Sequence, residues 1–401
     1  MVCLLRTHRQ LSRTDIASRT EFARSRISAV IESLLHLGLI SEIGDGESSG
    51  GRRPRLLALR GDFGALIGVD MGATSMDIAI ADFSGAVLDR ASIALDVRDG
   101  PQPVLSTLTA LLLDRLAVVG LAPDQVVSVG IGVPGPVDFD AGVLIAPPIM
   151  PGWDGYPIRQ AIWQTFPNAA VIVDNDVNVM ALGELRNGTG TRHENFIFVK
   201  VGTGIGSGIV CKGEIYRGAD GCAGDIGHIC ADHSGPVCHC GNIGCLEAIA
   251  AGPPIAARAT AAAEAGRSAI LSRLMDANGG VLTSVEVGKA AAQGDPVANA
   301  IIQDSGRILG EVLAGLVNFF NPSLILIGGG VSGIGHQFLA AIRRGVLHRS
   351  LPLSTRYLQI DVSAMGANAG MIGALALATE YALTPGREIA SNGHPALSLH
   401  R

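Results

Sequence analysis

Hydrophobic and polar residues in the first sixty positions follow a helical period. Residues 24–37 place apolar side chains on one face of a helix, at Ile27, Val30, Ile31, Leu34 and Leu35. A shorter helix precedes it within residues 11–20, where Ser and Thr can cap the first turn. Gly38 ends the longer helix, and the apolar stretches 39–43 and 56–59 then predict two strands. This order predicts a helix-turn-helix followed by a β-hairpin wing.

From residue 65 the pattern changes to strands that lead into glycine turns. Residues 65–81 are typical of a strand, a glycine turn and a second strand. A similar unit recurs at 196–210, where the glycine-rich segment 202–208 separates two strands, and a third glycine turn ends the strand that begins at Leu324. Backbone N–H groups in such turns can converge on phosphates, although most single glycine loops are only tight turns. The recurrence predicts a duplicated, two-lobed α/β architecture.

Composition agrees with this prediction. The chain has 401 residues, of which 48% are hydrophobic and 4% aromatic, and it contains 53 glycines. These values are typical of a glycine-rich α/β protein of two to three domains and exclude a disordered or fibrous chain. No segment resembles a signal peptide, and the apolar runs are too short to span a bilayer. We expect a soluble, cytoplasmic protein with no membrane partner.

Charge is unevenly distributed along the chain. Residues 1–60 carry ten Arg and six acidic residues, whereas the net charge of the whole chain is -6. A basic end on an acidic chain is typical of nucleic-acid binding, although it can also be a solvated face or a basic linker. The candidates for contact with a double-stranded DNA operator lie at the start of the longer helix and in the wing, and they are Arg24, Ser25, Arg26, Ser28, Arg52, Arg53 and Arg55.

A short loop between His228 and Cys245 concentrates soft metal ligands. Cys238, Cys240 and Cys245 together with one histidine would complete a tetrahedral structural zinc site. His228, His233 and His239 are all possible nitrogen ligands, and the spacing alone does not choose among them. The alternative is a glycine-rich loop with reduced cysteines, and four candidate ligands so close together weigh against it.

An acidic segment follows the apolar strand 171–173. Asp174, Asn175, Asp176 and Asn178 precede a helix that we expect to begin near Val179. Carboxylates at the C-terminal end of a strand face the cleft of an open α/β sheet. Asp176 could act as the general base of phosphoryl transfer, anchor sugar hydroxyls, or cap the helix.

These motifs together resemble the ROK family of sugar-responsive repressors and sugar kinases, in particular its branch with an N-terminal winged helix. The resemblance covers about residues 5–380. It is carried by the segments Asp70-x-Gly-x-Thr74, 130–138, 174–178, 202–206, 225–228 and 238–247. It implies two actin-like or ribonuclease H-like lobes around a sugar cleft, with a DNA-binding domain in front.

The resemblance also implies roles for single residues. It selects His228 as the histidine of the zinc site beside Cys238, Cys240 and Cys245. It assigns sugar contacts to Gly135, Asn175, Asp176, Asp225, His228 and Glu247. If the chain is a kinase, it further implies ATP, Mg²⁺, a catalytic Asp176, and a nucleotide site formed by Asp70, Gly72, Thr74, Gly202, Thr203, Gly204, Gly206, Gly328, Gly329 and Gly330.

Three positions depart from the family's kinases. Ala73 and Ser75 stand where those kinases have Gly and Lys, and Asp225 stands where they have Glu. An Ala crowds a phosphate loop, the loss of Lys removes a positive charge, and Asp is one methylene shorter than Glu. Each departure weakens the kinase interpretation, so we expect that the chain is not primarily an enzyme, although residual kinase activity is compatible with Asp176.

The predicted organisation has four parts. Residues 1–60 form a winged helix-turn-helix, 61–187 a first α/β lobe, 188–381 a second lobe with the zinc site, and 382–401 a flexible tail. We expect the last helix of the second lobe to pack back on the first. The predicted function is a sugar-responsive repressor of carbohydrate uptake or metabolism genes, acting as a homodimer or homotetramer on a sugar or sugar-phosphate signal. The alternative is an ATP-dependent sugar kinase with a fused DNA-binding domain.

Overall fold

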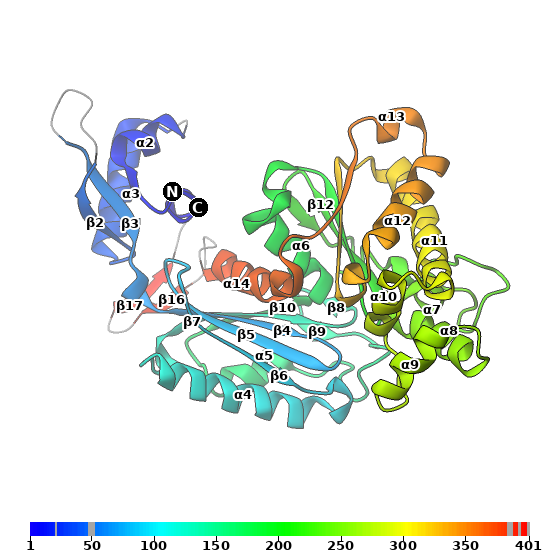
Figure 1. Cartoon of the computed structure of the whole chain (residues 1–401). Helices are drawn as coiled ribbons and strands as arrows, with labels where there is room; N and C mark the ends of the chain where they lie inside the picture. The colour runs from blue at the N-terminus through cyan, green and yellow to red at the C-terminus, as the bar shows by residue number, and fades with distance from the viewer. Residues whose placement is uncertain (21, 47–52, 383–387, 392–393, 399–401) are drawn as a thin grey trace.

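Two five-stranded sheets with the same connectivity form the frame of the structure (Figure 1). In each sheet the first strand in sequence is central, the second and third pair antiparallel on one side, and the fourth and fifth pair parallel on the other. The predicted duplicated, two-lobed α/β architecture is confirmed by this repetition. The structure is a computed structural model that describes residues 1–20, 22–46, 53–382, 388–391 and 394–398.

The first sheet is completely buried at its centre. All eight residues of β7 are buried, whereas the edge strand β6 contains no buried residue. Near-continuous apolar runs are typical of parallel strands that are covered on both faces. In spatial order the strands are β10 (Ala170–Asn175), β7 (Val126–Val133), β4 (Ala65–Met71), β5 (Ser75–Asp82) and β6 (Val87–Ala94). Helices α4 (Pro101–Val118) and α5 (Ile158–Trp163) cover one face, and β8 (Val137–Asp138) pairs with β9 (Val143–Leu144) in a small hairpin.

The second sheet is covered by a larger set of helices. Its strands in spatial order are β13 (Glu214–Tyr216), β12 (Ile205–Cys211), β11 (Phe196–Val201), β14 (Leu324–Gly328) and β15 (Gln359–Val362). Its helices are α7 (Leu246–Ala250), α8 (Gly252–Glu264), α9 (Ala269–Ala277), α10 (Ser284–Ala292), α11 (Pro296–Phe320), α12 (His336–Arg349) and α13 (Pro352–Thr355). Buried apolar side chains of the sheet and of most of these helices form one continuous core.

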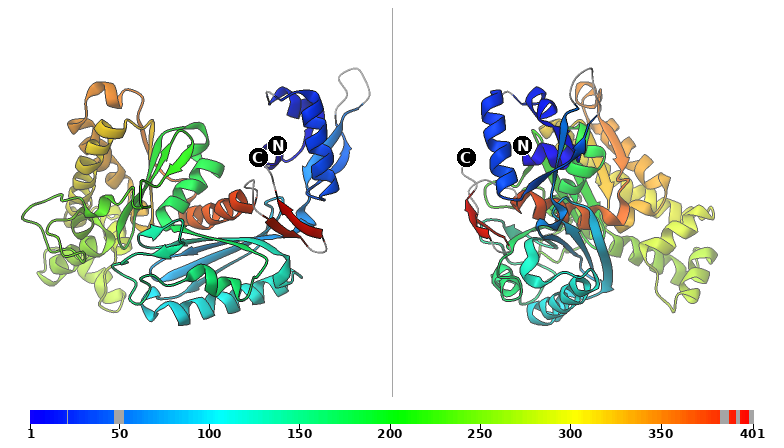
Figure 2. Two further views of the ribbon diagram at one scale, coloured as in Figure 1. Left: turned by 180° about the vertical axis from the view of Figure 1, so that it is seen from behind. Right: turned by 90° about the vertical axis from the view of Figure 1, so that its left-hand side faces the viewer.

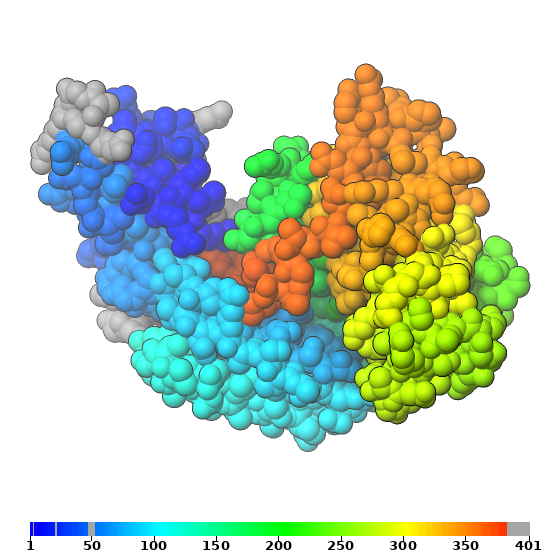
Figure 3. Space-filling model, viewed as in Figure 1, coloured from blue at the N-terminus to red at the C-terminus, as the bar shows by residue number. Residues whose placement is uncertain are grey.

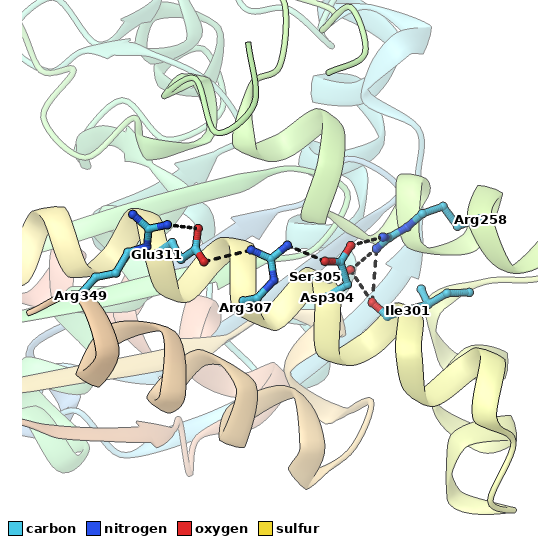
Figure 4. A network of polar contacts seen from close by, with 7 residues as sticks. All are labelled: Arg258, Ile301, Asp304, Ser305, Arg307, Glu311 and Arg349. Atoms are coloured by element: carbon cyan, nitrogen blue, oxygen red, sulfur yellow. Dashed lines mark hydrogen bonds and ion pairs between the residues drawn. The ribbon is translucent and has the colours of Figure 1, made fainter. Parts of the chain in front are cut away.

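The long helix α11 carries a row of ion pairs on its outer side (Figure 4). Arg307 contacts Asp304 at 2.7 Å and Glu311 at 2.9 Å on the same helix. Arg258 on α8 contacts Asp304 at 2.9 Å, and Arg349 at the end of α12 contacts Glu311 at 3.3 Å. The row therefore ties three helices of the second lobe together, although partly exposed pairs of this kind contribute little each.

Two helices pack against each other between the sheets. Helix α6 (Asp176–Asn187) contacts β11 and β12 of the second sheet, and α14 (Ala369–Ala382) contacts β4 and β7 of the first. Their backbones approach closely because glycines lie at the crossing: a Cβ on Gly373 would lie 1.8 Å from the carbonyl oxygen of Val179. The two lobes therefore meet through α6 and α14.

The N-terminal unit projects from the first sheet (Figures 2 and 3). It contains α1 (Val2–His8), β1 (Leu11–Ser12), α2 (Arg13–Ser18), α3 (Arg24–His36), β2 (Ile40–Asp45) and β3 (Arg55–Leu59), with the sheet order β1-β3-β2. Ser12 and Asp15 form a capping box at the start of α2. Ile27, Ile31 and Leu34 of α3 are buried as expected.

Two features of this unit differ from the sequence prediction. Helix α1 was not anticipated, and its Leu5 is buried in the core of the unit. Val30 was expected on the apolar face of α3 but is 39% exposed. It is an edge position, because Ile27, Ile31 and Leu34 already complete the stripe that faces the core.

A shared hydrophobic core joins the N-terminal unit to the first lobe, next to an aromatic contact in the connecting turn. Phe63, in the short turn Gly61–Phe63, lies 4.7 Å from Phe83 between ring centroids. Buried side chains of the N-terminal unit, of β4 and β5, and of α14 belong to one hydrophobic cluster. The unit is therefore packed on the lobe by a shared core.

The C-terminal segment differs from the flexible tail expected for residues 382–401. The structure contains two short antiparallel strands, β16 (Glu388–Ser391) and β17 (His394–Ser398). Residues 392–393, which separate the two strands, lie outside the described residues. Within the described ranges, no helix has the length and apolarity needed to cross a membrane.

Candidate functional site

Four side chains between β13 and the start of α7 gather into one cluster. The ligand atoms of His228, Cys238, Cys240 and Cys245 all lie within 4.8 Å of one another. Cys240 Sγ and Cys245 Sγ are 3.7 Å apart, close to the spacing of about 3.8 Å that two sulfurs take on a tetrahedral ion with Zn–S bonds of about 2.3 Å. The cluster could therefore hold a metal ion, and its donor set suits zinc.

The structure shows which of the three histidines of the loop belongs to the cluster. His228 Nδ1 lies 3.7 Å from Cys238 Sγ. His233 instead pairs with Cys230, at 3.4 Å between Nδ1 and Sγ, and His239 is absent from the cluster that the described residues form. Because Nδ1 of His228 lies beside a thiol, its Nε2 is left for another partner, as in many metal sites whose histidines make a second contact.

Glycines allow the loop from His228 to Cys245, called the metal loop below, to fold back on itself. Gly241 and Gly244 have φ of +87° and +72°, which side chains rarely adopt. A Cβ on Gly244 would lie 1.5 Å from the carbonyl oxygen of Asp232, and the Gly244 N–H donates to Pro236 at 2.8 Å. Gly244 is therefore required by the path of the loop.

The three thiols differ in how readily they ionise. Burial raises the pKa of Cys238 and raises the pKa of Cys245 to about 12. A backbone hydrogen bond from Asn242 lowers the pKa of Cys240 to about 7, and the nearby His228 acts in the same direction. Since metals bind thiolates, Cys240 is the thiol best prepared for a metal.

The segment 174–178 forms an acidic corner where β10 turns into α6. Asn175 caps the helix, since its Oδ1 accepts hydrogen bonds from Val177 N at 2.9 Å and Asn178 N at 3.4 Å. Its Nδ2 donates to the carbonyl oxygen of Gly135 at 2.8 Å. The fold therefore brings Asn175 and Gly135 together, and α6 begins at Asp176, three residues earlier than predicted.

Asp176 is buried at this corner and is not free. Its side chain accepts a hydrogen bond from Nζ of Lys200, which lies on β11 of the second lobe. The charges of Asp176 and of Asp70 raise the pKa of Lys200 against the opposing effect of burial. The pKa of Asp70 itself rises to about 7, mainly because burial disfavours its carboxylate, with Lys200 opposing the shift.

Arg217 makes a second basic contact with the acidic corner. It follows β13, and its Nε and Nη2 donate to Asp174 Oδ2 at 3.0 and 2.7 Å. Its guanidinium also lies 3.9 Å from the centre of the Phe139 ring. Asp174 in turn accepts from Asn178 Nδ2 at 3.1 Å. Arg217, a side chain of the second lobe, thus contacts two segments of the first lobe, at Asp174 and at Phe139.

The glycine-rich segment after Arg217 lies between the lobes. A Cβ on Gly221 would lie 2.2 Å from the carbonyl oxygen of Val137 in the first lobe. A Cβ on Gly224 would lie 1.9 Å from the carbonyl oxygen of Ser207 in the second. Asp225 follows this segment and is exposed directly before the turn that contains His228.

Glu247 links the metal loop to the glycine turn of the second lobe. It is the second residue of α7, two positions after Cys245, and its Oε2 accepts a hydrogen bond from Ile205 N at 3.0 Å. A Cβ on Gly204 would lie 2.2 Å from the same oxygen. Glu247 is therefore half-buried beside the turn and is not a solvent-facing helix residue.

The predicted nucleotide residues lie at the ends of central strands. Asp70 lies near the end of β4, and Gly72 and Thr74 lie in the β4–β5 connection; Gly328 ends β14, and Gly329 and Gly330 follow it. The turn after β11 is shorter than predicted: it contains Gly202, Thr203 and Gly204, whereas Gly206 already lies within β12, paired with Lys200. A Cβ on Gly206 would lie 3.0 Å from the Val177 side chain, so this position is closely packed against α6.

The predicted DNA-contact residues of α3 share one exposed end of the helix. Arg24, Ser25, Arg26 and Ser28 are all exposed, and the Arg26 guanidinium lies 4.9 Å from the Phe22 ring. In the wing, Arg53 is exposed, Arg55 pairs with Glu42, and Arg52 lies outside the described residues.

Sequence reasoning missed Lys200 and Arg217. A signal existed for Lys200, because a single charge inside the run Phe-Ile-Phe-Val-Lys-Val predicts a paired, half-buried group. Arg217 has no comparable signal, since it precedes a glycine-rich segment like many surface residues.

Comparisons with known proteins extend over most of the chain. The ROK family model matches residues 66–381. A xylose repressor from Caldicellulosiruptor bescii is 32% identical over 369 residues, which cover 92% of this chain and 91% of the relative.

Two solved structures are similar. The crystal structure of a ROK family transcriptional regulator, a homologue of the E. coli MLC protein, has a TM-score of 0.80 and 29% identity and covers 93% of both chains. A ROK family glucokinase from Streptomyces griseus, in complex with glucose and AMPPNP, has a TM-score of 0.70 and 31% identity and covers 79% of this chain and 100% of its own. The two five-stranded sheets thus form the actin-like domain of a sugar-kinase-like fold, and the chain belongs to the ROK family.

Proposed function

We propose that this protein is a sugar-responsive transcriptional repressor of carbohydrate uptake or metabolism genes. The observation that carries the proposal is a basic, exposed helix, α3, in a unit that shares a hydrophobic core with a sugar-kinase-like body. The match to a repressor and a transcriptional regulator over more than nine tenths of the chain supports it.

Residues 1–60 act in this proposal as a winged helix-turn-helix on a double-stranded DNA operator. Helix α3 is the recognition helix, with Arg24, Ser25, Arg26 and Ser28 directed to base edges and phosphates. The wing residues Arg52 and Arg53 supply charge for phosphates or a narrow minor groove. Arg55 is the weaker wing candidate, because its guanidinium already pairs with Glu42.

The cleft between the lobes takes a sugar or sugar phosphate as effector. The proposed contacts are Gly135, Asn175, Asp176, Asp225, His228 and Glu247. Support comes from the hydrogen bond between Asn175 and Gly135 and from the position of Glu247 between the metal loop and the glycine turn. A structural Zn²⁺ on His228, Cys238, Cys240 and Cys245 would fix the orientation of His228 toward the sugar.

The sugar acts on the operator by a population shift. It prefers one degree of lobe closure, and the N-terminal unit follows because its buried side chains share a hydrophobic core with β4, β5 and α14. In a homodimer or homotetramer, this closure changes the spacing of two winged helices on an operator of two half-sites.

A titration of operator affinity against sugars and sugar phosphates tests the proposal. A duplex selected from random sequence by the protein serves as the operator, and salt is held fixed because phosphate contacts make affinity salt-dependent. We expect one sugar class to change the affinity. If no duplex is enriched, or no sugar changes the affinity, the proposal is wrong. If operator affinity is unchanged in the variant Arg52→Ala/Arg53→Ala, the wing does not contribute to operator binding.

A sugar kinase is the second candidate. It is favoured by the similarity to the glucokinase over that enzyme's whole chain and by Asp176 at the end of β10. Asp176 would then be the base, and the three glycine turns would hold ATP with Mg²⁺. ADP release with a panel of sugars separates the two functions: turnover that depends on sugar and is lost in Asp176→Ala would favour the kinase.

A further inference from the structure

Lys200 occupies an unusual position among the glycine turns. It lies on the central strand β11, and its partners on the neighbouring strands are Gly206 and Gly328. Neither glycine has a side chain, and their side-chain positions are occupied by neighbours: a Cβ on Gly328 would lie 2.4 Å from the Phe198 ring, and a Cβ on Gly206 would lie 3.0 Å from Val177. A Cβ on Gly202 would lie 3.9 Å from Lys200 Cε. The lysine chain therefore runs along the turns that would cradle the phosphates of a nucleotide.

The ammonium group of Lys200 lies between carboxylates from the first lobe. Nζ pairs with Asp176, whose side chain is 5% exposed. Its charge also acts on the carboxylate of Asp70, at the end of β4. Both carboxylates come from strand ends that face the second lobe. A single positive charge of the second lobe thus acts on two acidic residues of the first lobe.

In a kinase, the space beside Asp176 that the Lys200 ammonium group occupies would be needed by other groups. A kinase requires a carboxylate free to accept the proton of the attacking hydroxyl, and divalent ions that bridge the phosphates. Mg²⁺ keeps several exchangeable positions for waters and phosphate oxygens, and it is usually bound through one or two carboxylates. An ammonium group offers three N–H donors that can hydrogen-bond to phosphate oxygens, but it cannot bridge them by metal coordination.

We propose that Lys200 is a built-in cation that replaces a divalent ion in the cleft, so that the cleft binds its ligand without Mg²⁺ and holds Asp176 as a paired carboxylate and not as a general base. The geometry carries the inference: one ion pair crosses the lobes beside the glycine turns that follow β11 and β14. Lys200 is in this sense a positioning residue. The inference rests on the proposed sugar-binding role of the cleft, but its test uses neither a sugar nor an operator.

Binding of Mn²⁺ to the zinc-loaded, full-length protein tests the proposal by electron paramagnetic resonance. Wild type is compared with Lys200→Met, which has a similar length and no charge, and with Lys212→Met, which removes an exposed lysine from the turn after β12. We expect Lys200→Met to gain a Mn²⁺ site at least about tenfold tighter than any in wild type or Lys212→Met, because two carboxylates lose their internal cation. The added substitution Asp176→Asn should abolish that site.

Equal Mn²⁺ binding by wild type and Lys200→Met would overturn the proposal. A new site that persists in Lys200→Met/Asp176→Asn would do the same. A measurement on wild type alone covers the case in which Lys200→Met does not fold: the affinity for a fluorescent ATP analogue is compared with and without Mg²⁺. We expect less than a twofold difference, and a large gain with Mg²⁺ would contradict the built-in cation. Loss of operator binding or of sugar response would leave these results unchanged, so the two proposals fail separately.

Discussion

Arg217 donates two hydrogen bonds to Asp174 Oδ2, at 3.0 and 2.7 Å, and Asp174 is almost completely buried in the acidic corner of the opposite lobe. Two residues further on, Asp176 is held by Lys200. The segment at the end of β10 therefore forms ion pairs with two basic residues of the second lobe. Any rotation of one lobe against the other must preserve or exchange these contacts.

Replacement of Arg217 should destabilise the protein. Arg217→Met leaves a buried carboxylate without its partner, and we expect the free energy of unfolding to fall by about 2–3 kcal/mol. Denaturant unfolding measures the change. Arg356→Met is the matched control, because Arg356 is exposed and stacks only on Tyr357. The double variant Arg217→Met/Asp174→Asn should recover part of the loss, and additive effects would argue against the pair.

Residues of α3 should contribute to DNA affinity through charge. Arg24→Ala/Arg26→Ala is expected to weaken binding to a selected duplex and to reduce the slope of log affinity against log salt by about 1 to 2, because each lost phosphate contact releases about one counterion fewer. Fluorescence anisotropy at several salt concentrations measures both quantities. Arg98→Ala, at a surface position paired with Asp96, is the control for a simple change in net charge. An unchanged slope would exclude these arginines from phosphate contact.

The sequence predicted well those features whose residues are close together along the chain. The candidate metal ligands lie within eighteen positions, from His228 to Cys245, and the fold brings them together. Strands were predicted at β4, β5, β11 and β14 because short apolar runs next to glycine turns are typical of buried strands. The choice of His228 from the residues alone was not possible, since His233 and His239 satisfy the same spacing.

The contacts between the lobes could not be predicted in this way. Lys200 and Asp176 are 24 positions apart, and Arg217 and Asp174 are 43 apart. Such pairs depend on how two sheets are placed by α6 and α14, and no local propensity encodes that placement. Gly206 illustrates the same limit, because its close approach to Val177 of α6, far away along the chain, is set by the packing of the lobes.

Loss of a metal ligand should act first on the sugar cleft. Cys240→Ser is expected to abolish stoichiometric zinc, lower the melting temperature and weaken the sugar response, because Glu247 and His228 are both positioned by this loop. Elemental analysis, thermal unfolding and the operator titration measure the three effects. Cys222→Ser, at an exposed cysteine outside the cluster, should change none of them. Loss of operator binding with intact sugar affinity would count against this role.

Stability should depend on pH through Asp70. Its pKa in the folded protein is about 7, above the ordinary value of 3.8, so the folded protein binds more protons than the unfolded chain between these pH values. The stability that Asp70 contributes is therefore highest below about pH 4 and is lost as the pH rises toward 7. Asp70→Asn cannot ionise, so its melting temperature relative to wild type should increase from pH 5 to pH 8. Asp276→Asn, at an exposed position on α9, is the matched control, and a constant difference across this range would refute the shift.

The crossing of α6 and α14 should tolerate no side chain at Gly373. A Cβ there would lie 1.8 Å from the carbonyl oxygen of Val179, and backbone cannot move aside as the end of a flexible side chain can. We expect Gly373→Ala to lower the free energy of unfolding by about 2 kcal/mol or more. Gly315→Ala is the control for the same substitution in a helix without a close neighbour. Gly315 lies on α11, is exposed, and has nothing within 4 Å of the Cβ position. That substitution should stabilise the protein by about 0.5–1 kcal/mol, because Ala has the higher helix propensity. Equal effects of the two substitutions in denaturant unfolding would mean that the lobes do not depend on close contact between these helices.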